Sequence, residues 1–203
     1  SLPVARIMGI KVSSALNIDN LPSGWVREWI GLNNECKEQI LWKNSDICEG
    51  TVSIIDKHTS WFPQNKRIKP LDIVTSLNLA FYLVEPHPSL IRCGYLAEFY
   101  DEYSIGLFDY RIGYGITESK PPISSLYSVF EIIEQFDFNY KHLQSRLNEL
   151  QWNKGTEIKK RGFPWLPDEV RKKLTFSNSD ECGVIILSQK DNQKIVFLAK
   201  RVV

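Results

Sequence analysis

The residues best suited to chemistry lie between Trp152 and Lys173, where basic and aromatic side chains are interleaved. Seven side chains in this segment are Lys or Arg, and three are aromatic. Cations neutralise phosphates, and aromatic faces stack on unpaired bases. The segment therefore predicts a surface that contacts a polyanion, either nucleic acid or an acidic protein partner. The residues assigned to this surface are Lys154, Lys159, Lys160, Arg161, Trp165, Arg171, Lys172 and Lys173.

The distribution of charge supports this interpretation but leaves an alternative open. The whole chain carries 25 basic and 24 acidic side chains, for a net charge of +1. Residues 85–138 have a net charge of −6, whereas residues 139–203 have a net charge of +6. A local field decides which partners are attracted. Either the basic end faces a partner, or it faces the acidic middle within one fold and Trp165 packs into the core.

A second pattern resembles the metal site of nucleases of the PD-(D/E)xK type. Glu157 and Lys159 fit the E-x-K triplet, and Asp137 lies 20 residues before the glutamate. Asp56 and His58 are further candidates, because two side chains two residues apart on a strand point to one side. The context is unfavourable, since Asp137 falls in a predicted helix and the triplet stands in a segment too polar for a buried strand. A metal-dependent nucleic-acid-processing enzyme is therefore the alternative and not the leading hypothesis.

Other common catalytic and cofactor motifs are absent from the sequence. There is no G-x-x-x-x-G-K-[ST] phosphate loop and no G-x-S-x-G nucleophile elbow. The four cysteines are far apart and include no C-x-x-C pair. We therefore predict no cofactor, no resident metal and no catalytic residue, and the sequence leans away from an enzyme.

A third hypothesis concerns the segment Tyr95–Ile116, which is rich in aromatic residues and acidic. Its second half alternates apolar and polar residues, which predicts a β-hairpin over residues 89–116. If this hairpin is exposed, Asp101, Glu102 and Asp109 make an acidic face for a basic partner, as in an immunity or inhibitor protein. The pattern alone does not decide whether the aromatic side chains are core or interface.

The clearest periodicity in the chain lies between Leu126 and Leu150. Two series of apolar residues repeat every seven positions and are offset by three, which fills the a and d positions of four heptads. This spacing predicts one long helix over about 124–154. Such a helix either packs on the sheet of its own domain or forms a seam for an oligomer. The eight residues are Leu126, Val129, Ile133, Phe136, Tyr140, Leu143, Leu147 and Leu150.

Further elements follow from shorter patterns. Apolar spacing of i, i+4 and i+7 predicts a short helix over 25–32, and a similar pattern after Pro70 predicts a helix to Val84. Pro167 followed by two acidic residues predicts the start of another helix. Two apolar runs joined by residues 190–193 predict a C-terminal hairpin.

The composition and the order of elements define the class of protein. With 43% hydrophobic residues and few cysteines, the chain is neither disordered nor a disulfide scaffold. No signal pattern and no long apolar run is present, so we expect a cytoplasmic protein with no membrane partner. The predicted fold is α+β, a single domain over 1–203 with a largely antiparallel sheet. A sub-division near 118–123 is possible, between a sheet-rich part (1–118) and a helical part with the hairpin (123–203). The leading hypothesis is a non-catalytic accessory protein within a complex.

Overall fold

The computed structural model describes residues 6–16, 21–64 and 81–202. The chain divides into two compact units that are interleaved along the sequence. Unit 1 takes Ser1–Leu71, Glu85–Ile105 and Ser124–Ser128, and unit 2 takes Asp72–Val84, Gly106–Ile123 and Val129–Val203. One boundary follows Ile123, close to the possible sub-division at 118–123, but no single cut separates the units. A single domain over 1–203 stays a prediction.

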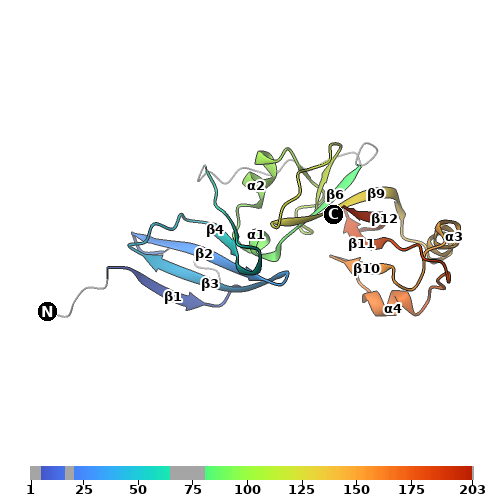
Figure 1. The fold of residues 1–203 in the computed structure, drawn as a ribbon, viewed down its shortest axis with the longest axis horizontal. Helices are drawn as coiled ribbons and strands as arrows, with labels where there is room; N and C mark the ends of the chain where they lie inside the picture. The colour runs from blue at the N-terminus through green and yellow to red at the C-terminus, as the bar shows by residue number, and fades with distance from the viewer. Residues whose placement is uncertain (1–5, 17–20, 65–80, 203) are drawn as a thin grey trace. The chain divides into compact units, whose positions relative to one another are not determined.

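Unit 1 is built on a five-stranded sheet in the order β1-β3-β2-β4-β5 (Figure 1). Neighbouring strands run antiparallel except β2 and β4, which run parallel. The strands are β1 (Met8–Val12), β2 (Trp25–Leu32), β3 (Glu35–Lys43), β4 (Thr51–Ile54) and β5 (Thr59–Trp61). A 3-10 turn, η1 (Ile55–Lys57), joins β4 to β5, and two helices, α1 (Pro88–Arg92) and α2 (Leu96–Glu102), complete the unit.

The helix predicted over residues 25–32 is wrong, because this segment is strand β2. Asn33 and Asn34 follow it with φ angles of 51° and 61°. Two consecutive residues with positive φ form the type I′ turn that matches the twist of a β-hairpin. Tryptophan and valine in β2 also favour strands over helices. The Asn-Asn pair is thus the local signal that fixes the β2–β3 hairpin.

The hairpin predicted over residues 89–116 is also wrong. Its first half forms α1 and α2, and its second half holds two short strands, β7 (Gly106–Leu107) and β8 (Gly115–Thr117). Helix α1 begins because His87 caps it, since the Nδ1 atom of His87 accepts a hydrogen bond of 3.2 Å from the N–H of Ser89. Pro88 occupies the first helical position, where its missing N–H costs nothing.

The seven-stranded sheet belongs mainly to unit 2 and has the order β10-β11-β12-β9-β6-β8-β7 (Figure 1). Strands β10 and β11 run parallel, and the pairs β11–β12, β12–β9, β6–β8 and β7–β8 run antiparallel. The remaining elements are β6 (Tyr82–Pro86), β9 (Tyr127–Asp137), α3 (Tyr140–Leu150), β10 (Glu157–Lys160), α4 (Pro167–Arg171), β11 (Val184–Lys190) and β12 (Gln193–Val202).

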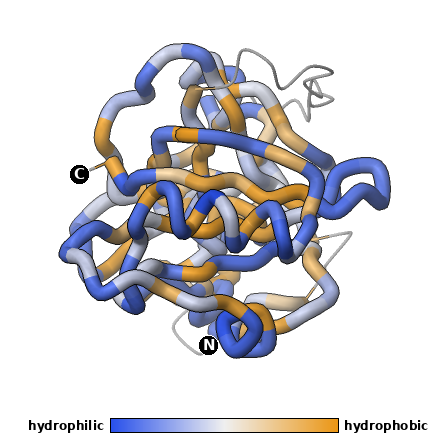
Figure 2. Tube along the Cα trace, turned by 90° about the vertical axis from the view of Figure 1, so that its right-hand side faces the viewer, coloured by the Kyte–Doolittle hydropathy of each residue, from blue (hydrophilic) through white to orange (hydrophobic). Residues whose placement is uncertain are grey.

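The central strands of unit 2 are buried on both faces. On one face, Ile185 and Leu187 of β11 pack with α3 and α4. On the other face, Val184 and Ile186 pack with residues of the 106–116 segment. A strand covered on both faces has a nearly continuous apolar sequence, as β11 and β12 do. Figure 2 shows hydrophobic stretches running through the middle of the trace and strongly hydrophilic stretches in its outlying turns.

The long helix predicted over 124–154 does not form. Residues 127–137 are strand β9, and a separate helix, α3, begins at Tyr140. The side-chain oxygen of Asn139 caps α3 by accepting from the N–H groups of Lys141 (2.9 Å) and His142 (3.1 Å). Residues 127–137 are rich in β-branched and aromatic side chains, which favour a strand when a partner such as β12 lies beside them. A spacing of seven cannot distinguish a helix from a strand that has apolar residues on both faces.

Because the long helix does not form, the heptad positions do not make the helical interface that was predicted for an oligomer. Leu143 and Leu147 of α3 are 0% and 1% exposed and pack in the core of unit 2 itself. Whether the chain forms oligomers stays a prediction. In residues 6–16, 21–64 and 81–202, every helix is too short or too polar to cross a membrane.

Three further predictions had different outcomes. The helix predicted from Pro70 lies mostly outside the described residues, and its last three residues, 82–84, belong to strand β6. Helix α4 begins at Pro167, as predicted, and β11 and β12 pair antiparallel as the expected C-terminal hairpin. The fold is therefore mixed, with two large and mostly antiparallel sheets and few helices.

Candidate functional site

Several chain segments lie together at one end of the sheet in unit 2. Strand β10 ends at Lys160, next to Leu187 of β11, and β9 ends at Asp137, next to Ile195 of β12. The turn between β11 and β12 occupies residues 191–192. Because β9, β10 and β11 all run toward this turn, the loops that follow β9 and β10 also reach it.

Four aromatic rings from these loops form a cluster on the helix-covered face. Phe138 lies in contact with three rings, those of Tyr140 (centroids 4.8 Å apart), Phe163 (5.0 Å) and Trp165 (5.3 Å). Phe163 is only 3% exposed, whereas Tyr140 and Trp165 are half-buried. Lys160 donates from its ammonium group to the backbone oxygen of Phe163 over 3.3 Å. In this cluster Phe163 is therefore buried, and the rings of Tyr140 and Trp165 reach solvent.

Two further lysines lie over the rings that reach solvent. The Nζ atom of Lys194 is 4.8 Å from the ring centroid of Trp165, and that of Lys173 is 5.1 Å from the centroid of Tyr140. Both distances are typical of cation–π contacts. We call Tyr140, Lys160, Trp165, Lys173 and Lys194 the basic–aromatic surface.

The cations of this surface are not neutralised from within. Lys160, Lys173 and Lys194 are all exposed. Within the part of the chain that the structure describes, no carboxylate lies at ion-pair distance from any of the three ammonium groups. An unneutralised cluster of cations beside aromatic rings can bind phosphates and stack against bases.

Several residues of the predicted site lie elsewhere. Lys159 points to the opposite face of the sheet, where its ammonium group is 3.4 Å from Glu157. The guanidinium of Arg171 donates to the backbone oxygens of Lys154 (3.1 Å) and Thr156 (2.6 Å), just before β10 begins. Lys154 and the Arg171 guanidinium therefore lie at the other end of the sheet. The predicted single surface over residues 154–173 is divided.

The remaining predicted residues are Arg161 and Lys172. Arg161 lies on the face opposite the helices, where its guanidinium carbon is 4.9 Å from the ring centroid of Tyr114. Lys172 is exposed at the end of α4. The structure therefore brings together three of the eight predicted residues, namely Lys160, Trp165 and Lys173.

Sequence reasoning missed two members of the surface, Tyr140 and Lys194. Tyr140 was assigned to a heptad position, and Lys194 was read as part of the C-terminal hairpin only. The sequence did contain a signal for Tyr140, because the preceding residue, Asn139, is of a type preferred at helix N-caps and marks the start of a new helix. For Lys194 there was no local signal, because only the pairing of β12 with β9 and β11 brings it near the loop after β10.

The residues of the nuclease hypothesis do not form a metal site. In the sheet register Glu157 stands level with Ile132, three strands away and five residues before Asp137. Strand spacing and rise place the two carboxyl groups about 20 Å apart, whereas ligands of one ion lie about 2–2.6 Å from it. Burial alone raises the pKa of Glu157, but the hydrogen bond from Arg201 and the charge of Lys159 outweigh it and lower the pKa.

The other candidate for a metal site also has a different role. Asp56 accepts a hydrogen bond of 3.3 Å from the N–H of Asn33, and His58 ends the turn η1 with a φ of 48°. Within the described residues, no group of three or more His, Cys, Asp or Glu side chains is arranged to hold a metal ion.

The acidic face of the third hypothesis does not form as a hairpin surface. Glu102 belongs to unit 1 and accepts a hydrogen bond of 2.9 Å from the indole N–H of Trp61. Asp109 belongs to unit 2, is 3% exposed, and pairs with Arg111 over 3.2 Å. The carboxylates of Glu102 and Asp109 therefore each stabilise the unit to which they belong.

The Asp109 pair predicts a dependence of stability on pH. Burial alone raises the pKa of Asp109, but the hydrogen bonds and charge of Arg111 outweigh it and hold the pKa below the ordinary value of 3.8. The pair therefore stabilises the fold above about pH 4, and this contribution is lost as the pH falls through the lower folded-state pKa. We expect Asp109→Asn to reduce the free energy of unfolding by about 1–2 kcal/mol at pH 7. The deficit should shrink as the pH falls below about 3.8, measured by urea unfolding at pH 7 and at successively lower pH; a deficit that does not shrink at the lowest pH contradicts this role.

Comparison with known proteins gives two matches. Residues 127–201 match the family described as THUMP domain-like, which covers β9 to β12 and the whole basic–aromatic surface. The fold also matches the crystal structure of a "putative methyltransferase" from Porphyromonas gingivalis W83, with a TM-score of 0.72 and 16% sequence identity. The match covers 97% of this chain and 51% of that protein, so the chain spans about half its length. No curated protein matches the sequence.

These matches correct the leading hypothesis on function. A non-catalytic accessory protein is contradicted by the THUMP-like segment together with the likeness to a protein described as a methyltransferase. The expectation of a nucleic-acid partner stands in its coarser form, because a THUMP-like segment is consistent with it.

Proposed function

We propose that this chain binds RNA through unit 2 and belongs to an RNA-modifying methyltransferase. The observation that carries the proposal is the position of the basic–aromatic surface, which falls entirely within the THUMP-like segment 127–201. Exposed lysines at this surface neutralise phosphates, and the rings of Tyr140 and Trp165 supply apolar faces for bases or riboses. The likeness to the P. gingivalis protein supports the class of reaction. We assign no step of methyl transfer to the described residues.

Binding to RNA can be tested with the chain as it stands. Fluorescence anisotropy of a labelled RNA, titrated with protein at 50, 100 and 200 mM salt, measures both affinity and its salt dependence. Three phosphate contacts predict that log K falls with log salt with a slope of about −2, because each contact with a single strand releases counterions with a slope of about −0.7. Absence of RNA binding at 50 mM salt contradicts the proposal.

The class of reaction needs a separate test. Total RNA from cells with and without the gene is digested to nucleosides and compared by mass spectrometry. We expect one methylated nucleoside to be lost in the deletion strain and restored by the intact gene. If RNA binding is found and every methylated nucleoside is unchanged, the RNA-binding part of the proposal stands and the methyltransferase part is wrong.

A further inference from the structure

A loop outside the THUMP-like segment presents the most exposed aromatic side chain of the described residues. Tyr110 is 70% exposed and lies between β7 and β8, on the face of the sheet opposite the helices. Other aromatic residues of this loop region, Phe108 and Tyr114, are 0% and 1% exposed. The loop thus buries its neighbouring rings and leaves one ring in solvent.

Hydrogen bonds to Asp109 hold the backbone on both sides of Tyr110. The carboxylate of Asp109 accepts from the N–H of Arg111 (2.7 Å), and its backbone oxygen accepts from the N–H groups of Ile112 and Gly113 (3.1 Å each). Gly113 has a φ of 76°, which a residue with a side chain adopts only at a cost. The exposed ring is therefore presented by an ordered loop, and little conformational entropy is lost when a ligand stacks on it.

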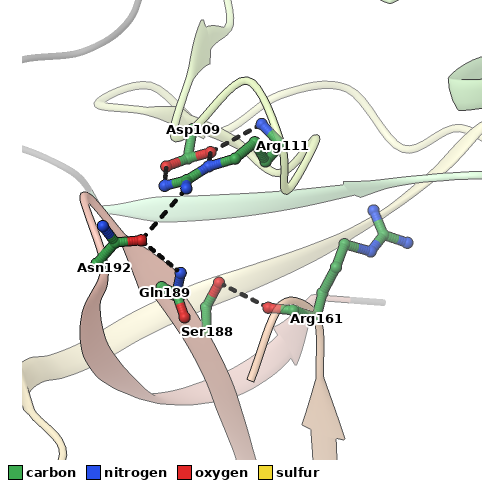
Figure 3. Close-up of polar contacts among 6 residues, drawn as sticks. All are labelled: Asp109, Arg111, Arg161, Ser188, Gln189 and Asn192. Atoms are coloured by element: carbon green, nitrogen blue, oxygen red, sulfur yellow. Dashed lines mark hydrogen bonds and ion pairs between the residues drawn. The ribbon is translucent and has the colours of Figure 1, made fainter. Parts of the chain in front are cut away.

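Arg111 connects this loop to the β11–β12 turn (Figure 3). Its guanidinium carbon is 5.3 Å from the ring centroid of Tyr110, and its Nη1 atom donates to the side-chain oxygen of Asn192 over 3.3 Å. Gln189 donates to the same oxygen, also over 3.3 Å. Two donors fix which way the Asn192 amide faces, and its NH₂ group donates to no acceptor in the described part of the chain.

The same turn carries the basic–aromatic surface on its other side. Gln189 pairs in register with Lys194, whose ammonium group covers Trp165. The turn therefore has Lys194 and Trp165 on the helix-covered face of the sheet and Arg111 with Tyr110 on the opposite face. A single RNA strand that passes round the turn meets both groups.

We propose that Tyr110, Arg111 and Asn192 form a second nucleotide subsite, in which an unpaired base stacks on the Tyr110 ring and accepts a hydrogen bond from the Asn192 amide. Arg111 acts as a positioning residue that ties the ring to the turn. The inference rests on the proposed RNA binding of unit 2. It extends the site to Tyr110 and Arg111, which lie outside the THUMP-like segment, beside Asn192, which lies within it.

The main test is Tyr110→Ala, assayed by anisotropy with the same single-stranded RNA. Loss of one stacked base is expected to weaken binding about tenfold, with an unchanged salt slope because no phosphate contact is removed. Tyr110→Phe keeps the ring and should bind within about twofold of the wild type. Phe62→Ala, which removes an exposed aromatic side chain from unit 1, is the matched control and should bind as the wild type does.

Asn192→Gly tests the amide without disturbing the turn. Asn192 has a φ of 67°, which glycine adopts readily, so the hairpin is kept while the amide is lost. We expect the wild type to bind some homopolymeric RNAs more tightly than others, because the Asn192 amide contacts a base edge, and this variant to bind them more evenly, because stacking alone tolerates every base. An unchanged difference among homopolymers in Asn192→Gly contradicts the role of the amide.

The outcomes separate this inference from the proposed function. If the wild type binds RNA and charge reversal at Lys173 and Lys194 weakens binding, while Tyr110→Ala binds normally, the second subsite is wrong and the proposed function stands. If the wild type binds no RNA, both are wrong. A tenfold loss in Tyr110→Ala, rescued in Tyr110→Phe, supports the subsite.

Discussion

Replacing Lys173 and Lys194 together by glutamate is expected to weaken RNA binding about 100-fold at 150 mM salt. Each substitution removes one counterion-releasing contact and adds a repulsive charge beside the RNA backbone. Both side chains are exposed and neither pairs with a carboxylate in the described chain, so the fold loses only the two cation–π contacts with Trp165 and Tyr140. Anisotropy titrations at several salt concentrations measure the loss, and the salt slope should fall by more than one unit.

A matched variant separates this surface from the effect of net charge. Lys57→Glu with Lys154→Glu changes the total charge by the same amount, but Lys57 is in unit 1 and Lys154 lies at the other end of the sheet in unit 2. We expect this control to weaken binding less than about threefold. If both double variants lose affinity equally, RNA binding depends on the overall field and not on the basic–aromatic surface.

Trp152→Ala is expected to have the largest effect on stability. The indole is 1% exposed in the core that α3 and α4 share with the sheet, and a Cβ atom at Gly183 would come within 2.2 Å of it. Truncation of a fully buried tryptophan removes its apolar contacts and leaves a cavity, at a cost of about 3–5 kcal/mol. This is a large fraction of the 5–15 kcal/mol that usually holds a domain folded.

Urea unfolding followed by circular dichroism measures this loss. Leu166→Ala is a suitable control, because Leu166 is 56% exposed and a surface substitution changes stability by about 0.5 kcal/mol or less. A loss below 1 kcal/mol for Trp152→Ala contradicts the packing described for this core. Trp152→Phe, which fills part of the same space, should lie between the wild type and the alanine variant.

Local sequence signals were reliable where backbone chemistry alone decides the structure. Pro167 with Asp168 and Glu169 defines the start of α4, because proline suits the first helical position and negative charge suits the helix N-terminus. Residues 190–193 indicated a turn, and the structure places positive φ angles of 49° at Asp191 and 67° at Asn192. Asn33 and Asn34 carried an equally good turn signal that apolar spacing obscured.

The spacing of apolar residues predicted the wrong element at β9, where apolar residues lie on both faces of the strand. In β9, Val129 and Phe130 are adjacent in sequence and are 5% and 0% exposed, so the strand does not alternate between apolar and polar residues. Its apolar positions also fit a heptad, and only the pairing with β12 decides between helix and strand. The polar segment around Glu157 forms strand β10, although its sequence is too polar for a strand that is buried on both faces. Strand β10 lies at the edge of its sheet and needs only one apolar face.

The chemistry of the candidate site was partly readable from composition. The excess of positive charge after residue 139 and the aromatic residues near it are properties of the chain itself, and they indicated a polyanion as the partner. Which of those residues lie together was not readable, because Lys160, Trp165 and Lys173 are joined by Tyr140 and Lys194 from segments 20–34 residues away in sequence. The amino-acid sequence alone thus determined which chemistry the chain can offer a ligand, since charge and ring content do not depend on folding. Only the tertiary structure decided which of these side chains lie together, because long-range strand pairing places the ends of β9 and β10 beside the β11–β12 turn.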